Sequence, residues 1–234
     1  NKFGDNWFVS AAGGVNLLVD KGFEVAPAFA LDVNVGKWVT PSVGVRLGYA
    51  GVKGAAWSND PTWLGAELDY DKCMYKQNFC STYIHGDVMW NVSNAWGGYK
   101  ETRFWNLVPY AHAGFYRSYG LDNVDFSNNE FAMGAGLLHN LRLTDRLDLK
   151  IDMRATVVNG RVHMSDGVAI LGSVTAGLAV DLGWPDFVRT ATVLAAADIA
   201  NAEKIAIIET AAAALELANA ALAEQNEKLA TTNM

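Results

Sequence analysis

A long alternation of apolar and polar residues between Phe131 and Val158 constrains the fold of this chain more than any other feature. In its second half, every odd-numbered residue from Leu147 to Val157 is apolar. The residues between them are polar: Asp148, Lys150, Asp152, Arg154 and Thr156. A strict period of two over this length predicts a β-strand with one apolar face and one polar face.

The first half of the stretch alternates in the same way and predicts the partner strand of a hairpin. Its apolar positions include Met133, Leu137 and Leu141, and residues 144–146 form the predicted turn. His139 interrupts the apolar face near the turn. A membrane interface would tolerate a polar ring at that position, because such interfaces accommodate amphipathic rings.

Two folds accommodate such a hairpin. In a soluble barrel or sandwich the apolar face packs in the core and the charges meet water. In a membrane barrel the apolar face meets lipid and the charges face the interior. The polar face also carries Ala132, Gly134 and Gly136, and glycine weakens a water-facing strand without compensation. Small residues beside paired charges suit a narrow, filled barrel interior, so the hairpin predicts a membrane barrel.

The length and composition are those of one domain with an appendage. The chain has 234 residues, of which 51% are hydrophobic, and a formal net charge of −7. The acidic balance argues against a nucleic-acid partner. No apolar run approaches the about 20 residues of a membrane helix, but each strand of a membrane barrel gives only a weak hydropathy signal. Because Asn1 follows neither an initiator methionine nor a signal peptide, we expect a mature or trimmed chain.

The alternation recurs along the chain and predicts eight antiparallel strands. They cover residues 7–17, 28–38, 43–50, 82–92, 107–119, 131–143, 147–158 and 168–184. The fifth strand has the least regular alternation and contains Pro109 near its start. An even number of antiparallel strands, each about eleven residues long, is typical of the smallest bacterial membrane barrels.

The predicted connections and the aromatic residues support this fold class. Connections after the second and sixth strands are short, and those after the first, third, fifth and seventh are longer. Short periplasmic turns and long outer loops produce this asymmetry, although residues 94–103 after the fourth strand depart from it. Aromatic residues near strand ends predict an interfacial girdle: Trp7, Trp38, Tyr49, Trp90, Trp105 and Trp184.

The character of the sequence changes after residue 184. Residues 194–230 contain no glycine or proline and are rich in alanine, glutamate and leucine, which predicts a helix. Apolar residues recur there at multiples of seven, interrupted at Asn201: Leu194, Ile208, Leu215, Leu222 and Leu229. This seam predicts a coiled coil or a docking helix, with a single solvated helix as the alternative. We expect a barrel over residues 1–184 and a helical linker over residues 185–234.

Three segments resemble the N-terminal barrel of OmpA-family outer-membrane proteins of the Bacteroidetes type. They are NWFVSAAGGVN (6–16), GKWVTPSVGVRLGY (36–49) and LRLTDRLDLKIDMRA (141–155). The resemblance covers residues 6–184 and implies an integral outer-membrane barrel followed by a helical linker. In that family the linker leads to a C-terminal domain that binds peptidoglycan through the diaminopimelate side chain. That domain is absent from the 234 residues, so cell-wall binding is implied only for a longer parent chain.

The last predicted strand resembles the outer-membrane insertion signal, which consists of a polar residue, a glycine and spaced apolar residues. The matching positions are Thr175, Gly177, Val180, Leu182 and Trp184. The resemblance therefore implies that this strand directs insertion into the outer membrane.

Charged residues on the predicted inner faces nearly balance. The acidic ones are Asp32, Asp87, Asp148, Asp152 and Asp181. The basic ones are Arg46, Arg142, Lys150 and Arg154. Ions in a narrow, poorly hydrated lumen are tolerated only when they are paired. An eight-stranded barrel filled in this way is predicted to be a plug rather than a water channel. A slow or gated pore is the alternative if the pairs rearrange.

Cys73 and Cys80 are the only cysteines, and both fall in the long predicted loop over residues 54–81. A cysteine pair in an exported loop predicts a disulfide. A ring this short would contribute about 2–3 kcal/mol by limiting the entropy of the loop. We do not expect a metal site from two thiols alone.

His85, Asp87 and His112 are the residues most suited to chemistry, and they lie on predicted inner faces. Catalysis would require a nucleophile or an activated water at an accessible rim. Their partners could equally be Arg46, Lys150 or Arg154, so we interpret the group as an interior network. We expect no enzyme activity and no cofactor.

The sequence therefore predicts an all-β, eight-stranded antiparallel transmembrane barrel followed by a C-terminal α-helical extension. We expect it in the bacterial outer membrane, with both termini in the periplasm. Its expected partners are outer-membrane lipid and other envelope proteins. The leading function is a structural anchor or a subunit of an envelope assembly. The alternatives are a small passive or gated porin and a soluble ligand-binding barrel.

Overall fold

The computed structural model describes residues 3–21, 23–59, 67–120, 127–159, 167–183, 187, 201, 203–216 and 219. The chain forms two units, Asn1–Phe187 and Val188–Met234. Each unit is described by itself below.

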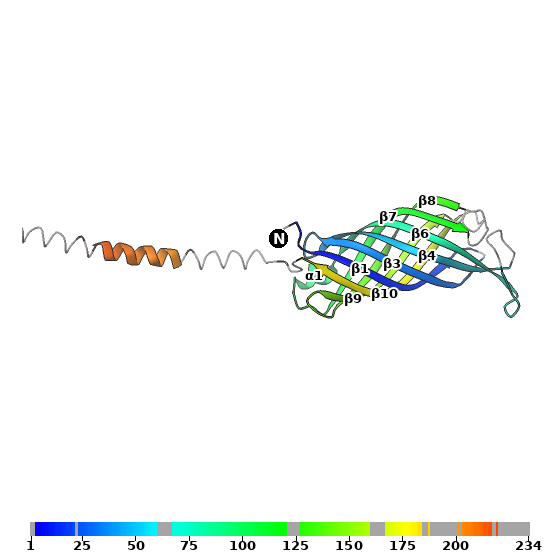
Figure 1. Cartoon of the computed structure of the whole chain (residues 1–234), viewed down its shortest axis with the longest axis horizontal. Helices are drawn as coiled ribbons and strands as arrows, with labels where there is room; N and C mark the ends of the chain where they lie inside the picture. Colours follow the sequence, from blue (N-terminus) through cyan, green and yellow to red (C-terminus); the bar gives the residue numbers. More distant parts are fainter. Residues whose placement is uncertain are drawn as a thin grey trace, which may run out of the picture. The chain divides into compact units, whose positions relative to one another are not determined.

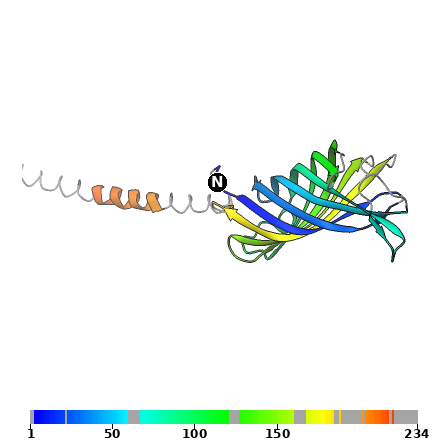
Figure 2. The same cartoon turned by 45° about the vertical axis from the view of Figure 1, so that its right-hand side comes forward.

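The first unit is a closed antiparallel β-barrel (Figures 1 and 2). Its strands are β1 (Trp7–Val19), β2 (Glu24–Val25), β3 (Pro27–Trp38), β4 (Val43–Ser58), β5 (Glu67–Asp69), β6 (Met74–Trp90), β7 (Trp105–Gly120), β8 (Ser127–Arg142), β9 (Leu147–Asn159) and β10 (Val168–Leu182). The sheet order is β4-β3-β1-β10-β9-β8-β7-β6, and β6 pairs with β4 again. Eight strands therefore close the barrel, as the alternation predicted. The short β2 and β5 pair only with β4 and β6.

The β8–β9 hairpin has its apolar side on the outside of the barrel. Leu137 is paired with Met153 and Gly136 with Arg154. Met153 is 38% exposed, whereas Arg154 is 5% exposed. A barrel that exposes its apolar residues and buries its charges is suited to contact with the lipid bilayer. The membrane-barrel interpretation of the hairpin is therefore confirmed, and the soluble alternative is wrong.

Inward-facing glycines make room for the large side chains that fill the lumen. A Cβ added at Gly36 would collide with the ring of Phe8, and one added at Gly136 would collide with the ring of Tyr110. Both rings are buried. The glycines of the polar face are therefore complementary in shape to aromatic residues on other strands, as close packing requires.

The two ends of the barrel differ. We call the end that holds Trp7 and Leu182 the terminal end, and the opposite end the loop end. Tight turns join β3 to β4 and β8 to β9 at the terminal end. The connection after β6, which departed from the predicted asymmetry, folds there into helix α1 (Val92–Gly97) (Figure 1).

Side-chain hydrogen bonds hold α1 against the neighbouring turn and strand. Asn91 caps its N-terminus by accepting from the backbone N–H of Asn94, as a helix N-cap does. Asn94 donates to the carbonyl of Pro41 at 2.8 Å, and Ser93 accepts from the backbone N–H of Leu107 at 2.9 Å. The long connection is therefore an ordered cap and not a loose loop.

At the loop end, β4 and β6 extend beyond the predicted strands. The expected polar loop over residues 54–81 is wrong in part, because β4 continues to Ser58 and β6 begins at Met74. The extension has its own small core of Ala26, Ala55 and Trp57, with Met74 packed against it. This packing stabilises the parts of β4 and β6 that lie outside the predicted strand limits.

The aromatic residues of the predicted girdle divide between two environments. Trp90 and Trp105 are exposed on the outer face near the terminal end. His139 also faces outward and stacks on Trp105, with ring centroids 5.8 Å apart. Trp38 instead packs with the inward-facing Phe8, so its assignment to the girdle was wrong.

The second unit is helical where it is described. Residues 203–216 are in α-helical conformation, which confirms the predicted helix over this part of the extension. Ile208 and Leu215 are exposed there. Leu194, Leu222 and Leu229 lie outside the described residues, so the coiled coil stays a prediction. In the described part of the chain, we find no helix with the length and hydrophobicity needed to cross a membrane.

Candidate functional site

The strongest candidate site is an ion-pair network that crosses the lumen. Arg46 on β4 donates through Nε to Asp87, its direct cross-strand partner on β6. The same guanidinium donates through Nη1 to Asp152 Oδ2 at 2.9 Å. Asp152 is on β9, four strands from β4 in either direction around the barrel. The contact therefore joins opposite walls of the lumen.

Arg154 forms a second link of this network. Its Nη2 lies 2.7 Å from Asp32 Oδ2 on β3 and 3.9 Å from Asp152 Oδ2 on its own strand. The side chains of Asp32 and Arg154 are each 3% exposed. Buried ions of this kind are stable only when a partner and further hydrogen bonds compensate their lost hydration. The network supplies both.

Tyr110 on β7 connects the two arginines, and our sequence reasoning did not identify it. Its hydroxyl donates to Asp152 Oδ1 at 2.5 Å and accepts from Arg154 Nε at 3.1 Å. The guanidinium of Arg46 lies 4.6 Å from the centroid of its ring. A continued period of two through Val108, Tyr110 and His112 was the signal that would have placed it inside.

His85, Asp87 and His112 lie together inside the barrel. His85 Nδ1 lies 2.6 Å from Asp87 Oδ1, and Tyr83 OH lies 2.9 Å from His112 Nδ1. The ring of Tyr83 stacks on that of His85 with centroids 4.9 Å apart. All four side chains are buried, so these groups belong to the interior network and not to an accessible rim.

The other predicted interior charges occupy two places. Lys150 is buried, and its Nζ lies 3.7 Å from the centroid of the Phe8 ring. The centre of the lumen thus holds three carboxylates and three cations: Asp32, Asp87, Asp152, Arg46, Lys150 and Arg154. Arg142, Asp148 and Asp181 instead line the opening at the terminal end.

The residues at this opening bond to neighbouring turns. Asp148 accepts from Asn140 Nδ2 at 2.6 Å. Arg142 donates to the carbonyl of Glu101 and lies 3.2 Å from the carboxylate of Asp145. Arg142 therefore fastens the cap after β6 to the β8–β9 turn and is not part of the central network.

A small polar cavity lies beside the central network. It is lined by Ser10, Asp32, Asn34, Arg46, Lys150, Asp152 and Thr175. Of these lining residues, Arg46 has a buried Nη2 without a hydrogen-bond partner among the described residues. The interior is therefore packed around the network, with a small cavity beside Arg46.

The residues of the predicted insertion signal lie on both faces of β10. Thr175 is buried on the inner face, whereas Val180 and Leu182 are exposed on the outer face. A Cβ at Gly177 would collide with the backbone of Ala11 and Ala12 on β1. Trp184 lies outside the described residues.

The predicted disulfide between Cys73 and Cys80 is absent, and both cysteines are free. Cys73 precedes β6 directly, and Cys80 lies within that strand. An extended strand rises about 3.3 Å per residue, so the two Cα atoms lie roughly 20 Å apart. A disulfide requires about 4.4–6.8 Å. The extension of β6 therefore overturns the prediction.

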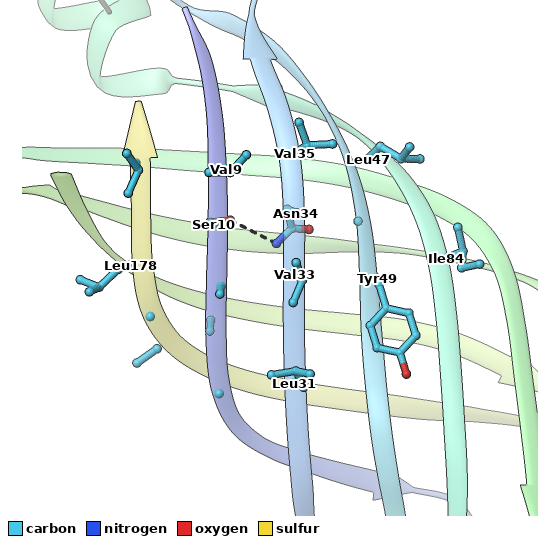
Figure 3. A pocket seen from close by; sticks show the side chains of 17 residues that line it. Val9, Ser10, Leu31, Val33, Asn34, Val35, Leu47, Tyr49, Ile84 and Leu178 are labelled. Atoms are coloured by element: carbon cyan, nitrogen blue, oxygen red, sulfur yellow. Dashed lines mark hydrogen bonds between the residues drawn. The ribbon is translucent and has the colours of Figure 1, made fainter. Parts of the chain in front are cut away.

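The outer surface of β10, β1, β3, β4 and β6 carries a shallow apolar depression (Figure 3). The outward side chains around it include Val33, Leu47 and Leu178. Ser10 and Asn34 lie on the inner side of the same strands, where Asn34 Nδ2 donates to Ser10 Oγ at 3.4 Å (Figure 3). The sharp division between the faces supports a lipid-facing exterior.

Comparison with known proteins agrees with this geometry. No protein-family model matches the chain. Outer membrane protein 41 of Porphyromonas gingivalis is 29% identical over 169 residues, which cover 68% of this chain and 39% of that protein. Outer membrane protein 40 of the same species is 24% identical over 177 residues, covering 66% of this chain and 40% of that protein. The chain thus spans about two fifths of the length of these relatives.

Among solved structures, Neisserial surface protein A superposes with a TM-score of 0.54 at 13% identity. The match covers 75% of this chain and 97% of that one. This likeness shows the fold. Together with the outer-membrane relatives, it identifies the chain as an outer-membrane β-barrel protein, while membership of the OmpA family stays a prediction.

Proposed function

We propose that the chain is a structural anchor of the outer membrane, in which the barrel is held by lipid and its interior is closed. The observation that carries this proposal is the contact of Arg46 with Asp152 across the lumen. The side chains of both residues are nearly fully buried. Separating such a pair inside a low-dielectric interior costs several kcal/mol, about 3–5 when one partner is removed. A lumen closed in this way suits a protein that holds its position and does not conduct.

The proposed orientation places the terminal end in the periplasm. An even number of antiparallel strands puts the start of β1 and the end of β10 on one side of the membrane. The turns joining β3 to β4 and β8 to β9 are short, as periplasmic turns of outer-membrane barrels are. The connections at the loop end are longer and would face the outside of the cell.

The helical segment would then leave the barrel on the periplasmic side. Its exposed apolar residues, among them Ile208 and Leu215, suit a spacer that docks on another envelope protein. The relatives are longer than this chain. A link to peptidoglycan is therefore proposed for a longer parent chain, through a further domain.

Planar-bilayer conductance tests the anchor directly. We expect the full chain to insert and to give no unitary current steps above those of the bare bilayer. Sustained steps at low voltage would contradict the closed interior and favour the second candidate, a small porin. Heat-dependent migration on a gel, typical of a closed barrel that resists detergent, provides the control for insertion.

One observation favours that second candidate. Asp152 lies 2.9 Å from Arg46 and 3.9 Å from Arg154, so one carboxylate has two cations within reach. An exchange of partners would let the network rearrange without leaving a charge unpaired. If the chain gates in this way, Asp152→Asn would change the opening frequency, whereas an anchor would stay silent.

A further inference from the structure

The signs of the charges are sorted between the two faces of the barrel. The structure describes the eight barrel strands completely, and every Asp and Glu in them lies on the inner face. The outward-facing Lys and Arg residues are Lys37, Lys53, Lys76 and Arg117. The outer face of the strands is therefore cationic although the chain carries a net charge of −7.

Strand register places two of these cations just beyond the apolar belt. Tyr49, Ile84, Phe115 and Phe131 face one another in one row across β4, β6, β7 and β8. The next outward row toward the loop end contains Thr82 and Arg117, and the one after it contains Lys53 and Tyr119. The apolar surface thus gives way to polar and basic side chains within two rows.

The depth of these rows matches that of lipid headgroups. Trp90 marks the terminal end of the belt on β6, and Cys80, the direct partner of Lys53, lies ten residues before it. Ten residues of strand extend about 33 Å, which corresponds to about 25 Å across the membrane at a tilt near 40°. This equals the usual height of the apolar band, so Lys53 lies at the opposite interface. Arg117 pairs with Thr82, eight residues before Trp90, which corresponds to about 20 Å across the membrane. Its long side chain covers the remaining distance to that interface.

Neither cation has a charge partner within the described part of the chain. Lys53 and Arg117 are exposed and make no ion pair with a described residue. The contact of the Arg117 guanidinium is with the ring of Tyr119, 5.8 Å from its centroid. β6 alone separates their strands, and their rows are two residues apart along the strand, so their Cα atoms lie about 12 Å apart. Two long side chains at this spacing can reach one anion.

We propose that Lys53 and Arg117, with Thr82 between them, form a basic patch that binds the phosphate of an anionic lipid in the leaflet at the loop end. The acyl chain of that lipid would run toward the bilayer midplane and cross the row of Tyr49, Ile84 and Phe115. Clusters of Lys and Arg at the membrane surface recognise anionic headgroups by charge, and the guanidinium fits phosphate oxygens with two hydrogen bonds. The inference rests on the membrane placement proposed above.

The experiment measures lipid retention by the full chain in nanodiscs. The nanodiscs contain phosphatidylcholine with increasing fractions of phosphatidic acid, whose phosphate monoester is the probe. After detergent extraction, native mass spectrometry counts the two lipids that stay bound. We expect phosphatidic acid to be retained preferentially. Since each cation near a membrane surface contributes about a fivefold preference, the single variants Lys53→Gln and Arg117→Gln should each lose about that factor.

The double variant K53Q/R117Q is compared with Lys37→Gln as a matched control. Lys37 also faces outward, but it lies at the terminal end and donates to the backbone carbonyls of Phe3 and Asp5. The control should keep the preference, and the double variant should lose it. Equal retention of phosphatidic acid by the wild-type chain and the double variant would overturn the proposal.

Two further measurements distinguish lipid binding from other roles of these cations. If inorganic phosphate at the same concentration displaces the lipid, the patch is a site for soluble anions and the lipid proposal is wrong. If the double variant unfolds at a lower temperature than the wild-type chain in pure phosphatidylcholine, the cations stabilise the chain through its own acidic residues. That result also contradicts the lipid proposal. Heat-dependent gel migration reports insertion separately. An inserted barrel without lipid preference overturns this inference alone, whereas failure to insert overturns the membrane placement.

Discussion

Arg46 on β4 and Asp152 on β9 are 106 residues apart in the sequence, and they meet across the diameter of the barrel at 2.9 Å. Arg46 also pairs with Asp87 beside it. One guanidinium thus pairs with two carboxylates on different walls, which makes it the centre of the interior network.

Replacing Arg46 by Met should destabilise the barrel strongly. Asp87 and Asp152 would lose a shared cation in a buried site, a loss that typically costs about 3–5 kcal/mol. Urea unfolding of the barrel in lipid vesicles measures the free energy. The neighbouring change Leu47→Met, on the lipid face, is the control and should change stability by less than about 1.5 kcal/mol. Similar small effects at both positions would contradict the network.

A charge introduced on the outer face should lower the stability of the barrel, whereas a charge on a water-exposed strand would not. Leu178 lies in the apolar depression of the outer surface. Leu178→Arg should cost about 2–4 kcal/mol near the bilayer midplane. Folding yield and urea stability in vesicles give the measurement, with Leu178→Met as the apolar control. If Leu178→Arg left the folding yield and stability unchanged, this face would not be in contact with lipid.

Two glycines test the packing of the lumen. A Cβ at Gly36 would collide with the ring of Phe8, whereas one at Gly86 on the outer face meets no heavy atom within 4 Å. Gly36→Val should therefore destabilise the barrel by about 1–3 kcal/mol through overpacking, and Gly86→Val should be nearly neutral. The double change Gly36→Val with Phe8→Ala should destabilise the barrel by less than the sum of the two single changes, because the two residues are in contact. Equal effects of the two single changes would mean that the lumen is not tightly filled.

Labelling of cysteines tests the orientation. Cys73 is exposed in the hairpin between β5 and β6 at the loop end. With Cys80 replaced by Ser, a membrane-impermeant maleimide should label Cys73 on intact cells. In a cysteine-free chain, Asp145→Cys in the exposed β8–β9 turn should react only after the outer membrane is permeabilised. The reverse pattern would place the termini outside the cell.

The sequence predicted the strands best where lipid contact enforces a strict alternation. The β8–β9 hairpin is such a case, because every second residue must be apolar over the whole height of the membrane. The prediction failed at residues 54–58 and 74–81, where this constraint ends. Beyond the apolar belt the two faces of a strand no longer differ: β4 packs Ala56 in the interior and Ala55 and Trp57 in the small outer core. The period of two therefore fades although the hydrogen bonding continues.

The members of the interior network were easier to predict than their partners. Inward charges follow from the alternation, but the pairing of Arg46 with Asp152 depends on how the sheet closes, which no local pattern contains. Tyr110 was missed because β7 places its large residues inside and small residues outside, unlike the other strands. Its inner face carries aromatic rings, and its outer face carries the small Ala111 and Ala113.

The seam between β1 and β10 has a consequence for the order of folding. These strands come from the two ends of the barrel sequence and pair from Trp7 with Leu182 to Val19 with Ile170. Until that seam forms, the inner carboxylates and arginines face an open sheet and have no enclosed lumen to pair in. Partly assembled barrels are therefore penalised, and the strands should enter the bilayer in one concerted step. Because its pairings are so distant in the chain, that step should also be slow.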